Sequence, residues 1–332
     1  MRKAFVVLLG VLVFFAAAAG DQCEAAAQKK IRIGLILPST VDDMAWSQSM
    51  VEGLKAVQKK MGESNMEIAI SEQMGKAVDA GAATRQYASQ GFEIVIAHGS
   101  QYQSVLPEIA KDFPKTTFAY GTGFQTEPNV FAYDPQAQDG GYLLGILAAK
   151  MTKSGVIGIV GPVQAGDAAK YNYGFQQGVT KTNPKATVRI AYTGSFGDIV
   201  GAGELAKTHM TAGADVLTGS SQQAVGAVRA VAEKPGIYWL STDLDQSSIG
   251  PNAVLASQVY NWEKVVNKII DLRKKGTLGG QVLTLSIADG TLELKYNSKL
   301  AGKVPKDLIA AIEKVKKDIA SGALKVELPQ KK

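Results

Sequence analysis

The sequence of 332 residues has little of what most catalytic sites need. It contains one cysteine, Cys23, and two histidines, His98 and His209. A single cysteine forms no disulfide within the chain, and no cluster of His, Cys and carboxylate residues has the spacing of metal ligands. No nucleophile-elbow pattern is present, and Gly-Thr-Gly at 121–123 lacks the third glycine and the helix of a dinucleotide fingerprint. We therefore expect no enzymatic activity, no cofactor and no metal.

The positive charge of the chain also lacks the pattern of a nucleic-acid surface. The formal net charge is +6, and much of the excess comes from lysines near the C-terminus, such as Lys303, Lys306 and Lys314. Few aromatic residues are interleaved with them, which is typical of a solvated face. We expect no nucleic-acid partner.

Residues 1–27 have the layout of a secretory signal peptide. Arg2 and Lys3 precede an uncharged apolar run from Ala4 to Gly20, and small residues follow as far as Ala27. The run is short for a membrane span, so we predict cleavage after Ala27 and a periplasmic protein. The alternative is a lipoprotein anchored through Cys23. It is less favoured because Gln22 and Gly20 stand where such signals have a small residue and a leucine.

The rest of the chain alternates strand-like and helix-like segments. Apolar runs such as Ile31–Leu37 and Phe92–Ala97 are each followed by a helical pattern, and the series restarts after residue 132. Alternation of this kind predicts parallel sheets with right-handed crossovers. We therefore predict an α/β fold with two doubly wound lobes. The first lobe comprises 28–132 plus 254–280, and the second comprises 133–253 plus 281–328.

The junction between these lobes has no low-complexity linker, which indicates several short crossings. Near the C-terminus, Asp289-Gly290 stands between two strand-like segments. Asp-Gly in this setting is a strong hairpin signal, and it favours placing both segments in the second lobe.

Aromatic and polar residues gather where the predicted strands end. Trp46 follows the first strand, at the sheet edge where ligands bind in open α/β folds. Trp46 from the first lobe and Phe196 from the second could hold a planar ring between them, and stacking on each aromatic is worth roughly 1–3 kcal/mol. Other candidate ligand-binding residues at strand ends are Asp43, His98, Gly121, Ser220, Gln222 and Asp243.

Structural roles are the alternative for several of these residues. Trp46 could pack into the core at the helix entry, and Phe196 could do the same. Asp42 could cap the helix that follows it, and Asp243 could only fix the hinge.

Several motifs, in the same order, resemble the basic membrane protein family, the PnrA-like periplasmic solute-binding proteins of ABC transporters. The matching stretches are 42–48, 142–149, 192–198, 213–216, 243–246 and 254–257. The resemblance covers essentially the whole mature chain. It implies a type I periplasmic-binding-protein fold whose lobes close over a purine nucleoside or a related compound.

The resemblance also implies roles for particular residues. Trp46 and Ser47 stand where the family usually has phenylalanine and asparagine, and Asp243 keeps a sugar contact. Tyr260 stands where a lysine reaches the sugar, and Leu37-Pro38 stands near the usual aspartate. With one base contact and one sugar contact missing, the departures favour a free purine base or another planar heterocycle, and a nucleoside is the alternative.

We therefore predict a monomeric solute-binding protein that delivers a purine-type ligand to the permease of an ABC importer. The alternative is the ligand-binding subunit of a sensory or signalling system with the same fold.

Overall fold

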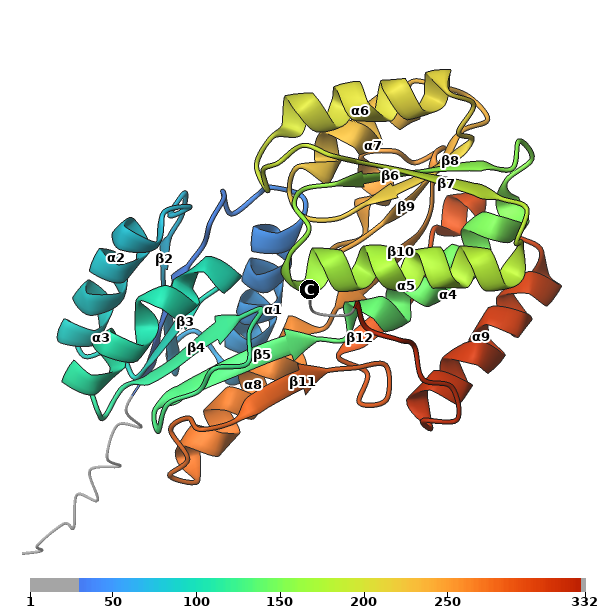
Figure 1. The fold of residues 1–332 in the computed structure, drawn as a ribbon. Helices are drawn as coiled ribbons and strands as arrows, with labels where there is room; N and C mark the ends of the chain where they lie inside the picture. Colours follow the sequence, from blue (N-terminus) through green and yellow to red (C-terminus); the bar gives the residue numbers. More distant parts are fainter. Residues whose placement is uncertain (1–29, 330–332) are drawn as a thin grey trace, which may run out of the picture.

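The computed structural model describes residues 30–329, so the predicted signal peptide and Cys23 lie outside the described residues. These residues form two lobes, each built around a sheet of six strands (Figure 1). The prediction of an α/β fold with two largely parallel sheets is confirmed.

The first lobe is a parallel sheet in the strand order β2-β1-β3-β4-β5-β11. Its central strands are buried along their whole length, as expected of parallel strands covered by helices on both faces. The strands are β1 (Ile31–Ile36), β2 (Met66–Ser71), β3 (Ile94–Ala97), β4 (Thr117–Gly121), β5 (Val130–Pro135) and β11 (Val282–Leu285).

Helices cover both faces of this sheet. On one face, α1 (Trp46–Met61) packs beside α8 (Trp262–Lys274) over Ile33 and Leu35 of β1. On the other, α2 (Ala77–Ser89), the short helix η1 (Ser100–Ser104) and α3 (Leu106–Asp112) pack over Ile36. Side chains on opposite faces of β1 therefore pack into two separate apolar clusters.

The second lobe repeats this arrangement in the order β7-β6-β8-β9-β10-β12, with only β12 antiparallel to its neighbour. In both lobes the strand order reverses beside the first strand, at β1/β3 and at β6/β8. The strands are β6 (Val156–Gly161), β7 (Thr187–Tyr192), β8 (Val216–Gly219), β9 (Tyr238–Ser241), β10 (Val254–Tyr260) and β12 (Leu292–Tyr296).

The helices of the second lobe are also divided between two faces. The pair α4 (Ala137–Met151) and α5 (Gly166–Thr182) covers one face, with α9 (Lys306–Ala320) against α4 (Figure 1). The pair α6 (Ile199–Thr211) and α7 (Ala224–Ala232) covers the other. Two short helices, η2 (Gln246–Ser248) and η3 (Ser298–Leu300), lie in the connections.

Glycines allow α4 and α5 to approach closely. A Cβ atom at Gly145 would collide with the carbonyl oxygen of Phe175, and one at Gly178 would collide with that of Tyr142. Because the obstructing atoms belong to the backbone, no change of side-chain rotamer can relieve these clashes.

The chain crosses between the sheets three times within the described residues: from β5 to α4, from β10 to α8 and from β11 to β12. The expectation of several short crossings is thus confirmed, but two strands lie in the opposite sheet from the predicted ranges. Strand β10, predicted in the first lobe, pairs with β9 and β12 of the second. Strand β11, predicted in the second lobe, pairs with β5 of the first.

The predicted hairpin at Asp289-Gly290 is correspondingly wrong. The turn itself forms: Gly290 has φ 67°, and the Asp289 carboxylate accepts hydrogen bonds from the N–H and hydroxyl of Thr291. However, the strands on either side of it pair with different sheets, so this turn is the third crossing between the lobes.

Candidate ligand-binding site

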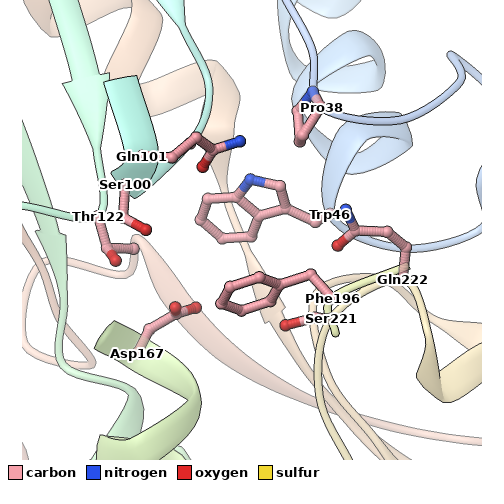
Figure 2. A pocket seen from close by; sticks show the side chains of 10 residues that line it. Pro38, Trp46, Ser100, Gln101, Thr122, Asp167, Phe196, Ser221 and Gln222 are labelled. Carbon is pink, nitrogen blue, oxygen red and sulfur yellow. The ribbon is translucent and has the colours of Figure 1, made fainter. Parts of the chain in front are cut away.

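A pocket lies where the carboxyl ends of both sheets face each other. Several of its lining residues follow β1 and β3 in the first lobe and β6 and β8 in the second. The strand order reverses between these strands, and such a reversal is the usual ligand position in doubly wound folds. It encloses about 390 Å³ of space, its opening to solvent included. Its lining consists of Pro38, Trp46, Gly99, Ser100, Gln101, Thr122, Asp167, Phe196, Ser221 and Gln222 (Figure 2).

The loop before α1 positions Trp46. The Asp43 carboxylate accepts hydrogen bonds from the backbone N–H groups of Ala45, Ser47 and Gln48, at 3.0–3.1 Å. Three donors at the start of α1 are thereby satisfied, which stabilises the helix start. The capping role considered for Asp42 therefore belongs to Asp43. Asp42 itself is exposed.

Trp46 is both a pocket wall and part of the core. Its side chain is only 7% exposed, and its indole N–H donates to the carbonyl oxygen of His98 at 3.0 Å. The rings of Trp46 and His98 stack with centroids 4.1 Å apart and planes 6° apart. The ring of Trp262 meets the indole edge-on. The two interpretations of Trp46 are thus compatible, since it packs into the core and lines the pocket.

His98 supports Trp46 from outside the pocket. It is fully buried, its Nε2 lies 3.1 Å from the carbonyl oxygen of Trp46, and its Nδ1 lies 2.7 Å from the hydroxyl of Tyr133. A carbonyl oxygen can only accept, so Nε2 carries the proton and Nδ1 accepts from Tyr133. Burial lowers the pKa of His98 to about 3, against an ordinary 6.5, and keeps the imidazole neutral.

Phe196 enters the pocket from the second lobe. It lies in the loop between β7 and α6, which is held by a hydrogen bond from the N–H of Gln223 to the Phe196 carbonyl oxygen at 2.9 Å. Its ring is 36% exposed. Figure 2 shows the ring of Trp46, from the first lobe, above the ring of Phe196, from the second, in the pocket that both line.

Of the predicted residues, the pocket lining includes Trp46, Phe196 and Gln222. Gly121 is buried beside the lining residue Thr122, with no room for a side chain against Tyr133. The prediction did not include Asp167, the one charged residue of the lining. It stands in the first turn of α5, a few residues past β6. Its position soon after a strand end is the one sequence signal that could have indicated a role in the site.

Four predicted residues, Ser47, Ser220, Tyr260 and Asp243, lie outside the pocket lining. The hydroxyl groups of Ser47 and Ser220 are buried and have no hydrogen-bond partner among the described residues. Tyr260 contacts Trp46 edge-on, and its hydroxyl accepts from the amide of Gln258 at 2.9 Å.

Asp243 has an unusual backbone conformation, with φ 71°, and its carboxylate accepts from the N–H of Ser221 at 3.1 Å. Burial and the nearby carboxylates of Asp167 and Asp43 raise its pKa well above the ordinary range. It lies outside the pocket lining, and together with Tyr260 it borders an adjoining groove between the lobes.

The lobes touch each other around the pocket. The side-chain amide of Gln246, in the second lobe, donates to the carbonyl oxygen of Met44 in the first at 3.0 Å. An ion pair of 2.5 Å joins Lys170 of α5 to Asp134 of β5. These contacts hold the two halves of the pocket together.

The pocket offers aromatic faces, hydroxyl groups, two amides and one carboxylate, and no lysine or arginine lines it. Such a lining suits a planar ring with polar edges. Within residues 30–329, no group of three or more His, Cys, Asp and Glu side chains could hold a metal ion. In the same part of the chain, no helix is both long and apolar enough to cross a bilayer.

Comparison with known proteins agrees with this architecture. Solved structures with the same fold include an ABC transporter solute-binding protein of Aeropyrum pernix, with a TM-score of 0.80 and 18% identity, covering 91% of this chain and 94% of that one. Another, from Conexibacter woesei, has a TM-score of 0.74 and 20% identity, with coverage of 90% and 99%.

Relatives in sequence have several names. A purine-binding protein of Brucella abortus is 26% identical over 90% of this chain and 83% of its own length. The nucleoside-binding protein BmpA of an ABC transporter of Lactococcus lactis is 26% identical over 88% and 86%. The transcriptional activator protein Med of Bacillus subtilis is 26% identical over 85% and 87%.

The model of one protein family, described as ABC transporter substrate-binding protein PnrA-like, matches residues 30–326, nearly all of the described chain. The chain therefore belongs to the PnrA-like family of ABC transporter substrate-binding proteins.

Proposed function

We propose that this protein captures a purine-type ligand, either a free base or a nucleoside, in the pocket between its lobes and delivers it to an ABC importer. The observation that carries the proposal is the pair of aromatic side chains, Trp46 and Phe196, that reach one pocket from opposite lobes. A ring held between them would contact both lobes and favour their closed arrangement, as in hinge closure around a ligand.

The polar surroundings of the pocket support the proposal. Hydroxyl and amide groups of Ser100, Gln101, Thr122 and Gln222 line it and can pair with the edges of a heterocycle. The names of two relatives, a purine-binding and a nucleoside-binding protein, point to the same class of ligand.

Isothermal titration calorimetry with adenine, hypoxanthine, adenosine, guanosine and inosine tests the proposal. Binding of at least one compound with 1:1 stoichiometry is expected. The base and nucleoside arms identify the form that is captured: tight nucleoside binding without base binding would exclude the free base. A lack of heat with all five compounds would refute the proposal.

A second candidate function is ligand sensing without transport. It is favoured by the relative named as a transcriptional activator and by a solved transcriptional activator from Bacillus halodurans with a TM-score of 0.74. Uptake of radiolabelled ligand by cells with and without the gene separates the two. Loss of uptake supports transport, and unchanged uptake with altered gene expression supports sensing.

A further inference from the structure

We propose that Asp167 determines the specificity of the pocket: it selects planar rings that present an N–H donor and rejects ring compounds that carry a negative charge. This inference rests on the proposed function, because it assigns a role within the same pocket.

The charge of the lining is the first observation. Asp167 is its one charged residue, and no lysine or arginine lies beside it there to balance a second negative charge. The nearest cation along α5 is Lys170, whose Nζ binds the Asp134 carboxylate at 2.5 Å and the Pro135 carbonyl oxygen at 3.2 Å. Both of these bonds lie at the crossing from β5 to α4 between the lobes, and Lys170 does not line the pocket.

The position of Asp167 is the second observation. Figure 2 shows its carboxylate pointing into the pocket, near the ring of Phe196 and opposite Thr122. The preceding residue, Gly166, comes so close to the first lobe that a Cβ atom there would lie 3.1 Å from Oγ1 of Thr122. Asp167 therefore stands where the two lobes meet, at the edge of any ring held by Trp46 and Phe196.

The environment of the carboxylate is the third observation. Burial raises the pKa of Asp167 to about 6, even though the charge of Lys170 and nearby backbone N–H groups favour the ionised form. At pH 7.5 the carboxylate is ionised, and the protein only partly compensates its negative charge. A ligand N–H would complete this compensation with a charge-assisted bond, whereas a ligand anion would add repulsion in a partly dry site.

A structural role is the competing explanation, because an acidic residue in the first turn stabilises a helix. Asp139 provides a matched control. It also stands in the first turn of a helix, α4, and burial also raises its pKa to about 6 in the presence of Lys170. However, Asp139 does not line the pocket.

The test compares adenine, a neutral purine with an amino group, with urate, a purine that is an anion at neutral pH. Adenine affinity is measured by calorimetry at pH 7.5, and urate affinity by displacement of adenine. The proteins are the wild type, Asp167→Asn, Asp167→Glu and Asp139→Asn, each checked for folding by its thermal transition.

We expect the ratio of adenine to urate affinity to fall at least tenfold in Asp167→Asn, which loses the charge and gains a donor. The ratio should stay within threefold of wild type in Asp139→Asn, and Asp167→Glu should retain most of it. Should Asp167→Asn not fold, Asp167→Ser is the substitute, with the same expected fall.

Different results would refute the inference and the proposed function. Equal affinities for adenine and urate in the wild type, an unchanged ratio in Asp167→Asn or an equal fall in Asp139→Asn overturns the role of Asp167 and leaves purine capture intact. Absence of binding by any purine base or nucleoside to the wild type overturns purine capture, and with it this inference.

Discussion

The indole of Trp46 lies flat on the imidazole of His98, 52 residues further along the chain, and the two residues also exchange hydrogen bonds through their backbone carbonyl groups. Trp46 can therefore neither tilt nor rotate without breaking contacts to a fully buried neighbour. One wall of the pocket is fixed before any ligand arrives, which lowers the conformational cost of binding.

Replacement of Trp46 should affect binding and stability together. Trp46→Ala removes a stacking face worth roughly 1–3 kcal/mol, so affinity should fall about 5- to 150-fold. It also removes a buried aromatic, at a cost of about 3–5 kcal/mol of unfolding free energy. Trp46→Phe keeps a ring, and its affinity should stay within about tenfold of wild type. Calorimetry and urea unfolding measure both effects, and unchanged affinity in a folded Trp46→Ala would exclude Trp46 as a ligand contact.

The neutral state of His98 should make the fold sensitive to acid. The unfolded chain binds a proton near pH 6.5, but the folded chain holds the pKa of His98 at about 3. The unfolded state therefore carries more protons between these values, and the unfolding free energy falls as pH drops below 6.5 and is unaffected by this group above it.

His98→Gln keeps a hydrogen-bond donor and acceptor but does not titrate. Its unfolding free energy should therefore lack the pH dependence due to His98, which is up to about 1.4 kcal/mol per pH unit. Urea unfolding between pH 4 and 8 measures the slope. The pKa of His209 is lowered by burial as well, and burial raises that of Asp167, which contributes with the opposite sign. Both groups are present in wild type and variant, so the difference in slope reports on His98. An equal slope in the two proteins would contradict the assigned neutral state.

Loss of the Asp43 carboxylate should loosen the start of α1. Asp43→Ala leaves three backbone N–H groups without their acceptor and should cost about 1–2 kcal/mol of unfolding free energy. Affinity should also fall several-fold, because Trp46 is the first residue of α1. The neighbouring Asp42→Ala is the control, with changes within about 0.5 kcal/mol. Equal effects of the two substitutions on the thermal transition would argue against the capping role.

A side chain at Gly145 should separate α4 from α5. Gly145→Ala places a methyl group against the carbonyl oxygen of Phe175 and should cost about 1–3 kcal/mol in urea unfolding. Gly203, within α6, offers the contrast, since a Cβ there lies 3.4 Å from its nearest neighbour. Gly203→Ala should be neutral or stabilising by up to about 1 kcal/mol through helix propensity. Similar losses at both sites would show that the close approach is not limiting.

The sequence allowed the repeated units of the fold to be predicted, but not the partners of the last strands. Apolar runs and helix periodicity are local, and β1 and β3 coincide closely with the predicted runs Ile31–Leu37 and Phe92–Ala97. The pairing of β10 and β11 depends on strands far away in the sequence. The Asp289-Gly290 signal correctly predicts a turn, yet it carries no information on which sheet each flanking strand joins.

The same distinction applies to the pocket. Trp46 and Phe196 could be predicted because aromatic residues at strand ends are conspicuous. The support of Trp46 by His98 depends on the adjacency of β1 and β3 and on a side-chain orientation that no local pattern encodes. Asp167 was missed because an acidic residue in the first turn of a helix is common, and only the packing of α5 turns it toward the pocket.

Because the consecutive strands β11 and β12 join different sheets, the order of synthesis also constrains when the protein can fold. Each is an edge strand, added to a sheet whose other five strands come earlier in the chain. The first sheet is complete only after Leu285 has left the ribosome and the second only after Tyr296 has, so both lobes reach their final form late in synthesis. Truncation before β11 would leave two unfinished sheets with exposed edges, and neither lobe can be produced alone as a continuous segment of the chain.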